Sequence, residues 1–472
     1  MNNYEVRQLG QNKGAPRLWL EGVQPERAGF APGSRYKVEA KVERNMVVLS
    51  LAENGDRIVS RKDKGGKQIP VIDLNSQQVL SLFRGMDAVR VVMKESVIYI
   101  MPLASEVRKR RRVESLKQTL EAEQPITVGS LSHGGGVLSH AVHQGLHAAG
   151  LKSRLAFAND IRSELLEHAS TANDAWDKET TLIAAPLQEV AFDRYAMEQL
   201  PEVNTLELGL PCSGASVAGR AKRGLAMPED HPEVGHLVAA AISVIAWVNP
   251  AVILFENVVQ YGSSASMSIL RTQLRDMGYE VHERQVAGKD WNSLEDRKRM
   301  VMVAVTEGID FDFDLLVPPE PVARTLSEVL EDIPDTDPRW SKMEGLKAKE
   351  LRDKEAGKGF AMQIFGKDDD HIGTITKGYA KVRSTDPKIR CETNPELLRQ
   401  LTPAEHARCK DIPPHLVEGL SNTIAHELLG QSVCQRPFVS IAKLIGESLK
   451  SWAGKVEEIL PVVPQQALLL AA

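Results

Sequence analysis

The stretch at residues 126–149, ITVGSLSHGGGVLSHAVHQGLHAA, combines an apolar strand pattern, a glycine-rich loop and a helical pattern. The alternation of short apolar strands with helices continues along the chain. We predict strands at residues 126–130, 155–158, 205–210, 251–255, 279–286 and 300–305, and helices at residues 138–149 and 234–248. This order is typical of a doubly wound α/β sheet, in which ligands bind beyond the carboxyl ends of the strands.

The regions on either side of this pattern differ from it. Residues 1–112 carry short β-branched stretches separated by turn signals and predict a β-rich accessory domain. Residues 113–124 predict a charged helical linker, and residues 125–306 form the central α/β domain. Residues 307–394 are rich in proline and charge and show no clear period. Residues 395–472 return to a helical pattern and are expected to rejoin the central domain.

Composition excludes several classes of protein. A formal net charge of -5 argues against a uniformly basic coat, although it leaves room for local basic clusters. The four cysteines form no C-x-x-C pair, so we expect neither a zinc site nor a disulfide framework. The longest apolar run is too short to cross a bilayer, and the first residues lack a secretory signal pattern. We therefore expect a cytoplasmic protein without a bound metal or a membrane anchor.

The glycine-rich loop is a candidate cofactor site. Ser132, Gly134 and Gly136 lie where glycines allow a ligand to approach the backbone and where a helix begins with free N–H groups. Asp160 closes the next predicted strand, and an acidic side chain at that place suits the hydroxyls of a ribose. Together these residues favour an adenosyl cofactor. A tight turn without a ligand is the alternative for the loop taken alone.

Two other strand ends carry reactive side chains. Cys212 follows Pro211 at the end of a predicted strand. A thiol there can act as a nucleophile once it has lost its proton and become a thiolate. Glu256 closes a wholly apolar strand, and burying its carboxylate unpaired would be costly. Arg297 and Arg299 precede the last strand and, one residue apart, are expected to share a face. Each feature alone also fits a bland structural role, such as a buried thiol or a solvated strand end.

The order of these motifs resembles that of DNA cytosine-5 methyltransferases over residues 126–447, including phage or prophage-type members. The series ends in Leu401-Thr402-Pro403-x-Glu405 and Gly430-x-Ser432-Val433. The resemblance implies a Rossmann-like S-adenosyl-L-methionine-dependent methyltransferase domain with a mixed sheet. It implies that Cys212 adds to C6 of a flipped-out cytosine and that Glu256 protonates N3.

The same resemblance assigns the remaining positions. Arg297 and Arg299 would stabilise the cytosine O2, and Asn257 would brace the Pro-Cys loop. Gln431 and Ser432 would join the cofactor site. Residues 307–394 correspond to a target recognition domain for double-stranded DNA. The expected DNA contacts come from the active-site loop and from this domain: Ser213, Arg220, Arg223, Lys377, Lys381 and Arg383. A companion restriction endonuclease is an expected partner, and the oligomeric state is left open.

The N-terminal domain resembles swapped-hairpin DNA-binding domains of the SymE or AbrB type, around residues 17–22 and 28–30. We interpret it as an accessory DNA-binding module. A purely structural or dimerising domain is the competing interpretation.

Several positions depart from the family pattern, and most of them border the cofactor. Ser130-Leu131-Ser132-His133-Gly134 stands where the family has Asp-Leu-Phe-Ala-Gly, and residues 184–187 lack the usual aspartate. Gln431 replaces an asparagine, and Glu295 replaces a glutamine. A second hypothesis is therefore a carboxylated S-adenosylmethionine as donor, giving a larger C5 substituent. A third is a catalytically inactive DNA-binding protein. A nucleotide-level pyrimidine enzyme is a further option, but the long insertion after Glu307 suits a polymer substrate better.

Overall fold

The computed structural model describes residues 3–12, 15–214, 224 and 226–455, and the chain divides into two units, with the boundary between Glu114 and Ser115. The boundary falls inside helix α3 (Ala104–Glu121), which precedes the first strand of the second unit. Each unit has its own hydrophobic core. Within the described ranges, no helix combines the length and the apolar character needed to cross a membrane.

The N-terminal unit is built from strands, as predicted. A six-stranded sheet has the order β1-β9-β10-β5-β4-β6, and a four-stranded sheet has the order β2-β3-β8-β7. The strands are β1 (Asn3–Gln8), β2 (Gly10–Asn12), β3 (Ala15–Glu21), β4 (Arg35–Lys41), β5 (Met46–Leu51), β6 (Arg57–Ile58), β7 (Ser60–Lys64), β8 (Lys67–Leu74), β9 (Ala88–Lys94) and β10 (Val97–Pro102). Two short helices, α1 (Val23–Arg27) and α2 (Gln77–Leu80), accompany them. Leu18, Phe30 and Ile98 are among the residues of the shared core.

The second unit contains the predicted α/β domain. Its seven-stranded sheet has the order β13-β12-β11-β14-β15-β17-β16, and β17 runs antiparallel to both of its neighbours. The sheet is therefore mixed, as expected. Its strands are β11 (Ile126–Leu131), β12 (Ser153–Asp160), β13 (Thr181–Ala184), β14 (Thr205–Leu208), β15 (Val252–Asn257), β16 (Tyr279–Ala287) and β17 (Lys298–Thr306).

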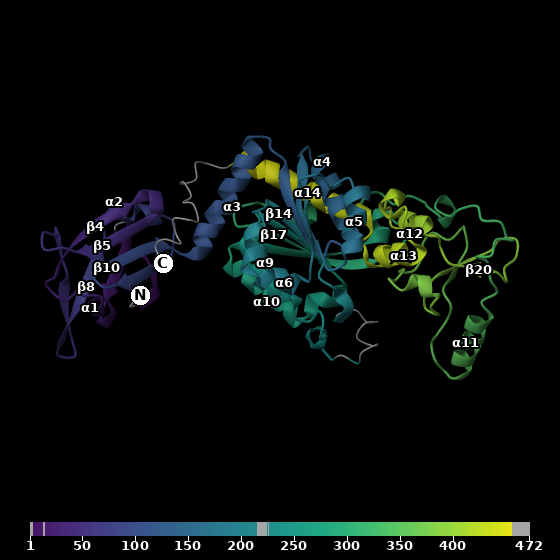
Figure 1. Ribbon diagram of the computed structural model, residues 1–472, viewed down its shortest axis with the longest axis horizontal. Coiled ribbons are helices and arrows are strands. Elements are labelled where there is room, and N and C mark those ends of the chain that lie inside the picture. The colour runs from purple at the N-terminus through teal and green to yellow at the C-terminus, as the bar shows by residue number, and fades with distance from the viewer. Residues whose placement is uncertain (1–2, 13–14, 215–223, 225, 456–472) are drawn as a thin grey trace. The chain divides into compact units, whose positions relative to one another are not determined.

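Helices cover both faces of this sheet (Figure 1). The helices α4 (Val137–Ala148), α5 (Ser163–Ala172) and α14 (Gln435–Ala453) cover one face. The other face packs against α6 (Leu187–Phe192), α7 (Arg194–Gln199), α9 (Leu237–Val248) and α10 (Ala265–Asp276). Helix α14 lies close against α4, because a methyl group on Gly145 would stand 2.4 Å from the Ala442 side chain. The C-terminal segment thus returns to the first helix of the α/β domain.

The proline- and charge-rich region packs around a small core that it shares with neighbouring segments. It contains α11 (Glu344–Glu355) and a small sheet of β18 (Ile364–Phe365), β19 (Lys388–Arg390) and β20 (Leu398–Arg399). Ile372, Ile375 and Tyr379 pack with Leu401 and Cys409 in one buried cluster. The helices α12 (Pro403–Cys409) and α13 (Asn422–Gln431) follow and lead into α14.

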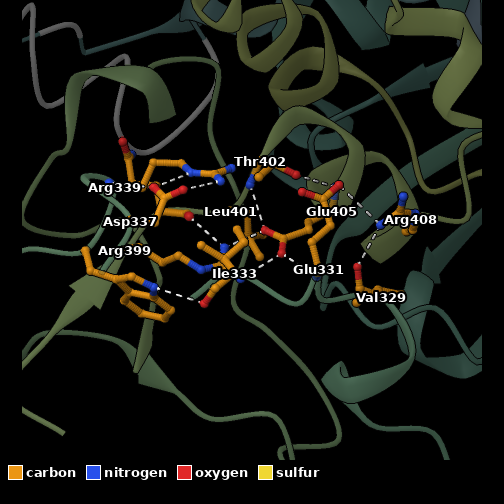
Figure 2. A network of polar contacts seen from close by, with 12 residues as sticks. Val329, Glu331, Ile333, Asp337, Arg339, Arg399, Leu401, Thr402, Glu405 and Arg408 are labelled. Atoms are coloured by element: carbon orange, nitrogen blue, oxygen red, sulfur yellow. Dashed lines mark hydrogen bonds and ion pairs between the residues drawn. The ribbon is translucent and has the colours of Figure 1, made fainter. Parts of the chain in front are cut away.

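A buried carboxylate fixes this region to the start of α12 (Figure 2). Arg399 makes two hydrogen bonds to Glu405, of 2.6 and 2.7 Å, and both side chains are almost fully buried. Glu405 also accepts the backbone N–H groups of Thr402 and Glu331, each at 2.7 Å. Thr402 in turn caps the helix by accepting Glu405 N. The Leu-Thr-Pro-x-Glu motif therefore has a structural role, because it fixes the proline- and charge-rich region to the start of α12.

Candidate active site

The Pro-Cys step begins where the central strand β14 ends. Cys212 starts a short 3-10 turn, Cys212–Gly214, and its thiol is free and partly exposed. The neighbouring strand β15 runs parallel, so that its end, at Glu256 and Asn257, lies at the same edge of the sheet. The Asn257 amide donates a hydrogen bond of 3.0 Å to the carbonyl of Leu210. Asn257 therefore ties the end of β15 to the segment that leads to the thiol.

Glu256 has a large part of its carboxylate removed from water. Its Oε2 lies 3.4 Å from Nε of Arg299, yet this buried oxygen forms no hydrogen bond with the described residues. Burial raises the pKa of Glu256, and the positive charges of Arg299, Arg297 and Lys410 oppose that rise only in part. A methyl group on Gly209 would stand 2.8 Å from Oε1, so only glycine leaves this carboxyl its space. Burial thus shifts this carboxyl toward its protonated form, and its Oε2 is left without a hydrogen bond among the described residues.

The two arginines have different partners, although their spacing predicted a shared face. Arg299 lies in β17 beside Glu256, and burial lowers its pKa while Glu256 and Cys212 act to raise it. The thiol, the carboxyl and this guanidinium therefore surround one place. Arg297 precedes the strand and is buried, donating to the carbonyl of Gly430 at 2.9 Å and to that of Ile375 at 3.4 Å. Its contacts join α13 to the segment before Tyr379.

Glu295, two residues before Arg297, belongs to a buried ion pair. Glu295 occupies the place of the expected glutamine, and its Oε2 lies 3.4 Å from Nζ of Lys410, with both side chains fully buried. Lys410 also donates to the carbonyls of Leu429 and Ser432. The pKa of Lys410 falls to about 8, chiefly through burial. The sequence analysis did not identify Lys410, which supplies the counter-charge for a glutamate in a position where the family pattern has a neutral amide.

The glycine-rich loop has the backbone geometry of a ligand cradle. Ser132, Gly134 and Gly136 all have positive φ angles, of 56°, 56° and 73°. Asp160 accepts the N–H of Gly134 at 2.8 Å and that of Arg162 at 2.9 Å, so it shapes the loop as well as ending β12. A methyl group on Gly134 would meet nothing within 4 Å, which leaves room in front of the loop. These residues fit an adenosyl cofactor, because the part-exposed carboxylate retains lone pairs for ribose hydroxyls.

The late motif reaches the same loop through α13. A methyl group on Gly135 would stand 2.3 Å from the side chain of Leu428, so α13 packs directly against the loop. Gln431 is exposed at the end of this helix. The Ser432 hydroxyl donates 2.8 Å to the carbonyl of Leu428 and closes the last turn.

The predicted DNA contacts fall into two groups. Lys377, Lys381 and Arg383 are exposed on one short segment of the second unit. The side chain of Ser213 and the residues Arg220 and Arg223 lie outside the part of the chain that the structure describes.

Known proteins match the region that carries this site. The family model of C-5 cytosine-specific DNA methylases matches residues 140–450. The type II methyltransferase M.NlaX of Neisseria lactamica is 26% identical over 270 residues, which cover 55% of this chain and 80% of that protein. The type II methyltransferase M1.ScrFI of Lactococcus lactis subsp. cremoris is 26% identical over 268 residues, covering 54% of this chain and 64% of the relative.

A solved structure shows the same fold. The crystal structure of the S. pombe Dnmt2 methyltransferase matches with a TM-score of 0.54 and 18% identity, covering 70% of this chain and 99% of that one. The likeness supports the α/β fold with its mixed sheet. Because the family model spans well over half of the sequence, the chain belongs to the C-5 cytosine-specific DNA methylase family.

Proposed function

We propose that this protein transfers a methyl group from S-adenosyl-L-methionine to C5 of a cytosine in double-stranded DNA, through a covalent bond between Cys212 and C6. The observation that carries the proposal is the convergence of Cys212, Glu256 and Arg299 at adjacent strand ends. A thiol, a carboxyl whose pKa is raised by burial and a cation match the three needs of this reaction. These are a nucleophile for C6, a proton for N3 and a positive charge near O2.

The residues act in a fixed order. The Cys212 thiolate forms the S–C6 bond, while Glu256 gives its proton to N3 and the electron pair of the C5–C6 double bond becomes available at C5. Bound S-adenosyl-L-methionine supplies the electrophilic methyl group that C5 takes up. A water molecule then removes the C5 proton, the S–C6 bond breaks to release the Cys212 thiolate, and the N3 proton returns to Glu256. Arg299 stabilises O2 throughout, and Asn257 keeps the thiol in position through Leu210.

The substrate must present its base outside the helix. A thiol at the edge of the sheet cannot reach C6 of a cytosine that is stacked inside the duplex, so the target cytosine is flipped out. We propose that Lys377, Lys381 and Arg383 contact the phosphate backbone, with residues 307–394 as the target recognition domain, and that Ser213, Arg220 and Arg223 contact the DNA around the flipped base. A companion restriction endonuclease stays a prediction.

The cofactor would be held by the glycine-rich loop. Ser132, Gly134 and Gly136 would approach it through the backbone, and Asp160 would accept the ribose hydroxyls. Gln431 and Ser432 would border it from α13. The carboxylated donor would need a free cation near the transferred group. Gln431 is neutral, and Lys410 is committed to Glu295 and two carbonyls, so ordinary S-adenosyl-L-methionine fits better.

Product analysis tests this proposal. Mass spectrometry of nucleosides from DNA incubated with the protein and S-adenosyl-L-methionine should show 5-methylcytosine, and Cys212→Ala should abolish it. A duplex containing 5-fluorocytosine should trap the wild-type chain covalently, since the C5 substituent cannot leave as a proton. Trapping of the Cys212→Ala variant would refute the assigned nucleophile. A carboxymethyl product, or no modified base at all, would favour one of the two other hypotheses.

A further inference from the structure

Glu207 is a buried carboxyl that the proposed reaction does not use. It lies in β14, the central strand of the sheet, and is 2% exposed. The strand register places it directly beside Ser130 of β11 and Leu254 of β15. Among the described residues, only His133 comes within ion-pair range, with Nδ1 at 4.0 Å from Oε1. An ionised carboxylate at this depth would ordinarily need a cation.

His133 is not that cation. The indole N–H of Trp176 can only donate, and it lies 3.1 Å from Nε2 of His133. Nε2 must therefore accept, and the ring proton is carried by Nδ1, which lies 2.8 Å from the Ser130 hydroxyl. Burial lowers the pKa of His133 to about 3, so the ring is neutral. The chain of donors runs from Trp176 through His133 to Ser130, whose own hydroxyl faces Glu207.

The first turns of α4 complete the surroundings of Glu207. The Ser139 hydroxyl is fully buried and faces the Glu207 carboxyl, with no other hydrogen-bond partner among the described residues. Burial raises the pKa of Glu207 to about 7, the hydroxyls of Ser130 and Ser139 oppose the rise, and Glu256 adds to it. Ser130 lies just before the loop that begins at Ser132, and Ser139 lies in α4, the helix that follows this loop. Glu207 thus lies beneath the glycine-rich loop, surrounded by neutral donors.

S-adenosyl-L-methionine carries two positive charges at its amino-acid end, the sulfonium and the ammonium. We propose that Glu207 is the carboxylate that complements this positive charge from beneath the loop. The register adds a reason, since Ser130 replaces the acidic residue of the resembled pattern and Glu207 stands next to it on the adjoining strand. The inference rests on the proposed use of this donor. Glu207 is a positioning residue, because it acts on the cofactor's charge and not on the reacting carbon.

The variant Glu207→Gln separates this role from a structural one. Glutamine keeps the size and the hydrogen-bonding oxygen but never carries the charge. Isothermal titration of the full chain would use three ligands. S-adenosyl-L-methionine carries both cations, S-adenosylhomocysteine keeps only the ammonium, and 5′-methylthioadenosine has neither. We expect Kd for S-adenosyl-L-methionine to rise on the order of 10- to 100-fold in the variant, as for loss of a charged partner. Kd for 5′-methylthioadenosine should not change.

The other measurements show which cation of the ligand Glu207 complements and whether the charge of Glu207 is responsible. An unchanged Kd for S-adenosylhomocysteine assigns the sulfonium as partner, and an equal rise assigns the ammonium. In the wild type, affinity for S-adenosyl-L-methionine should increase between pH 6 and pH 7 as Glu207 ionises, below the range in which the ligand's α-ammonium loses its proton. His133, Ser130, Ser139 and Glu256 face the same group, and none of them supplies a titrating cation in this range. Glu207→Asp should retain this pH dependence, whereas Glu207→Gln should lose it.

Two results would overturn the inference. One is a Glu207→Gln variant that binds S-adenosyl-L-methionine like the wild type at all pH values. The other is an equal loss for all three ligands, which would mean that the variant deforms the loop. Failure of the wild type itself to bind S-adenosyl-L-methionine would instead remove the proposed donor, and this inference with it.

Discussion

At the scale of single residues, Glu256 shows how burial raises the pKa of a carboxyl even beside cations. The proposed step needs a proton on this carboxyl, and burial raises its pKa while Arg299 lies 3.4 Å away. We expect Glu256→Gln to lower kcat by about 10² to 10⁴, because an amide can hydrogen-bond N3 but cannot protonate it. Single-turnover methylation would measure this. A variant that keeps most of the wild-type rate would exclude Glu256 as the proton donor.

The pH profile gives an independent check on the same residue. Protonated Glu256 is the active form, so the rate should fall as pH rises past its raised pKa. Glu256→Gln should lose this descending limb, while any ascending limb due to the thiolate should persist. Rates measured from pH 5.5 to pH 9 on a preformed DNA complex would show it. An identical descending limb in the variant would assign that limb to another group.

Glu207 links pH to stability as well as to binding. Its pKa is higher in the folded protein, at about 7, than the ordinary value of 4.5. The folded state therefore binds this proton more tightly, and the stabilisation is complete below pH 4.5 and lost as pH rises through 7. The loss amounts to at most about 3 kcal/mol. Urea unfolding of Glu207→Gln should show a smaller fall in stability between pH 5 and pH 8 than the wild type does. Equal slopes would contradict the shift.

At the scale of elements, the buried Arg399–Glu405 ion pair at the start of α12 tests how strongly a buried charge pair affects stability. Glu405 accepts hydrogen bonds from Arg399 and from two backbone groups while fully buried. We expect Glu405→Gln to destabilise the second unit by about 3 to 5 kcal/mol, because Arg399 would be left buried without its counter-charge. Thermal unfolding would measure it.

The matched control is the exposed pair of Arg194 and Glu198. Its side chains are 86% and 44% exposed and one helical turn apart. Glu198→Gln should change stability by less than about 1 kcal/mol. Similar losses in the two variants would mean that burial does not decide the difference.

Helix α13 contacts both the glycine-rich loop and the segment around Lys377, for which we propose a role in DNA recognition. Its glycine at position 430 touches that segment, since an added methyl would stand 2.3 Å from the backbone nitrogen of Lys377. We expect Gly430→Ala to weaken DNA binding by displacing that segment, with little change in Kd for S-adenosyl-L-methionine. Gly345→Ala is the control, because nothing lies within 4 Å of a methyl group there. Fluorescence anisotropy with duplex DNA would separate the two variants, and equal binding by both would refute the contact.

Sequence patterns predicted the strands and helices whose apolar residues follow a recognisable pattern. Six strands of the central sheet were found because most of them are short, largely apolar runs between turn or helix signals, whereas β13 was missed because it is a short edge strand with exposed side chains. Cys212 and Glu256 could be identified because strand ends meet at one edge of the sheet. Arg297 could not be separated from Arg299, because its partners, Gly430 and Ile375, come from distant segments. Strands of two or three residues, such as β18, β19 and β20, are too short to give a period.

At the scale of the whole molecule, the N-terminal unit is a second folded body with its own core. Its β7 and β8 form a hairpin that turns at Gly65 and Gly66. The hairpin exposes four cations: Arg61, Lys62, Lys64 and Lys67. Of these, Lys62 is paired with Glu21. On the adjoining strand β3, the Arg17 guanidinium lies 4.9 Å from the Trp19 ring centre, beside a hollow of about 430 Å³, and is paired with Asp73 at 2.8 Å. Exposed cations gathered on one hairpin fit DNA better than they fit a dimer interface, whose centre is usually depleted of charge.

We therefore expect this unit to add affinity for DNA without reading its sequence. Replacing Arg61, Lys64 and Lys67 by glutamine in the full chain should reduce the slope of log affinity against log salt by about 2 to 3, as lost phosphate contacts do. Replacing Lys37 and Arg44, exposed on other elements of the unit, should leave the slope nearly unchanged. Because the charges lie outside the catalytic unit, kcat at saturating DNA should stay constant. A change in sedimentation instead of in the salt slope would make the hairpin a dimer contact, since only self-association depends on the protein's own concentration.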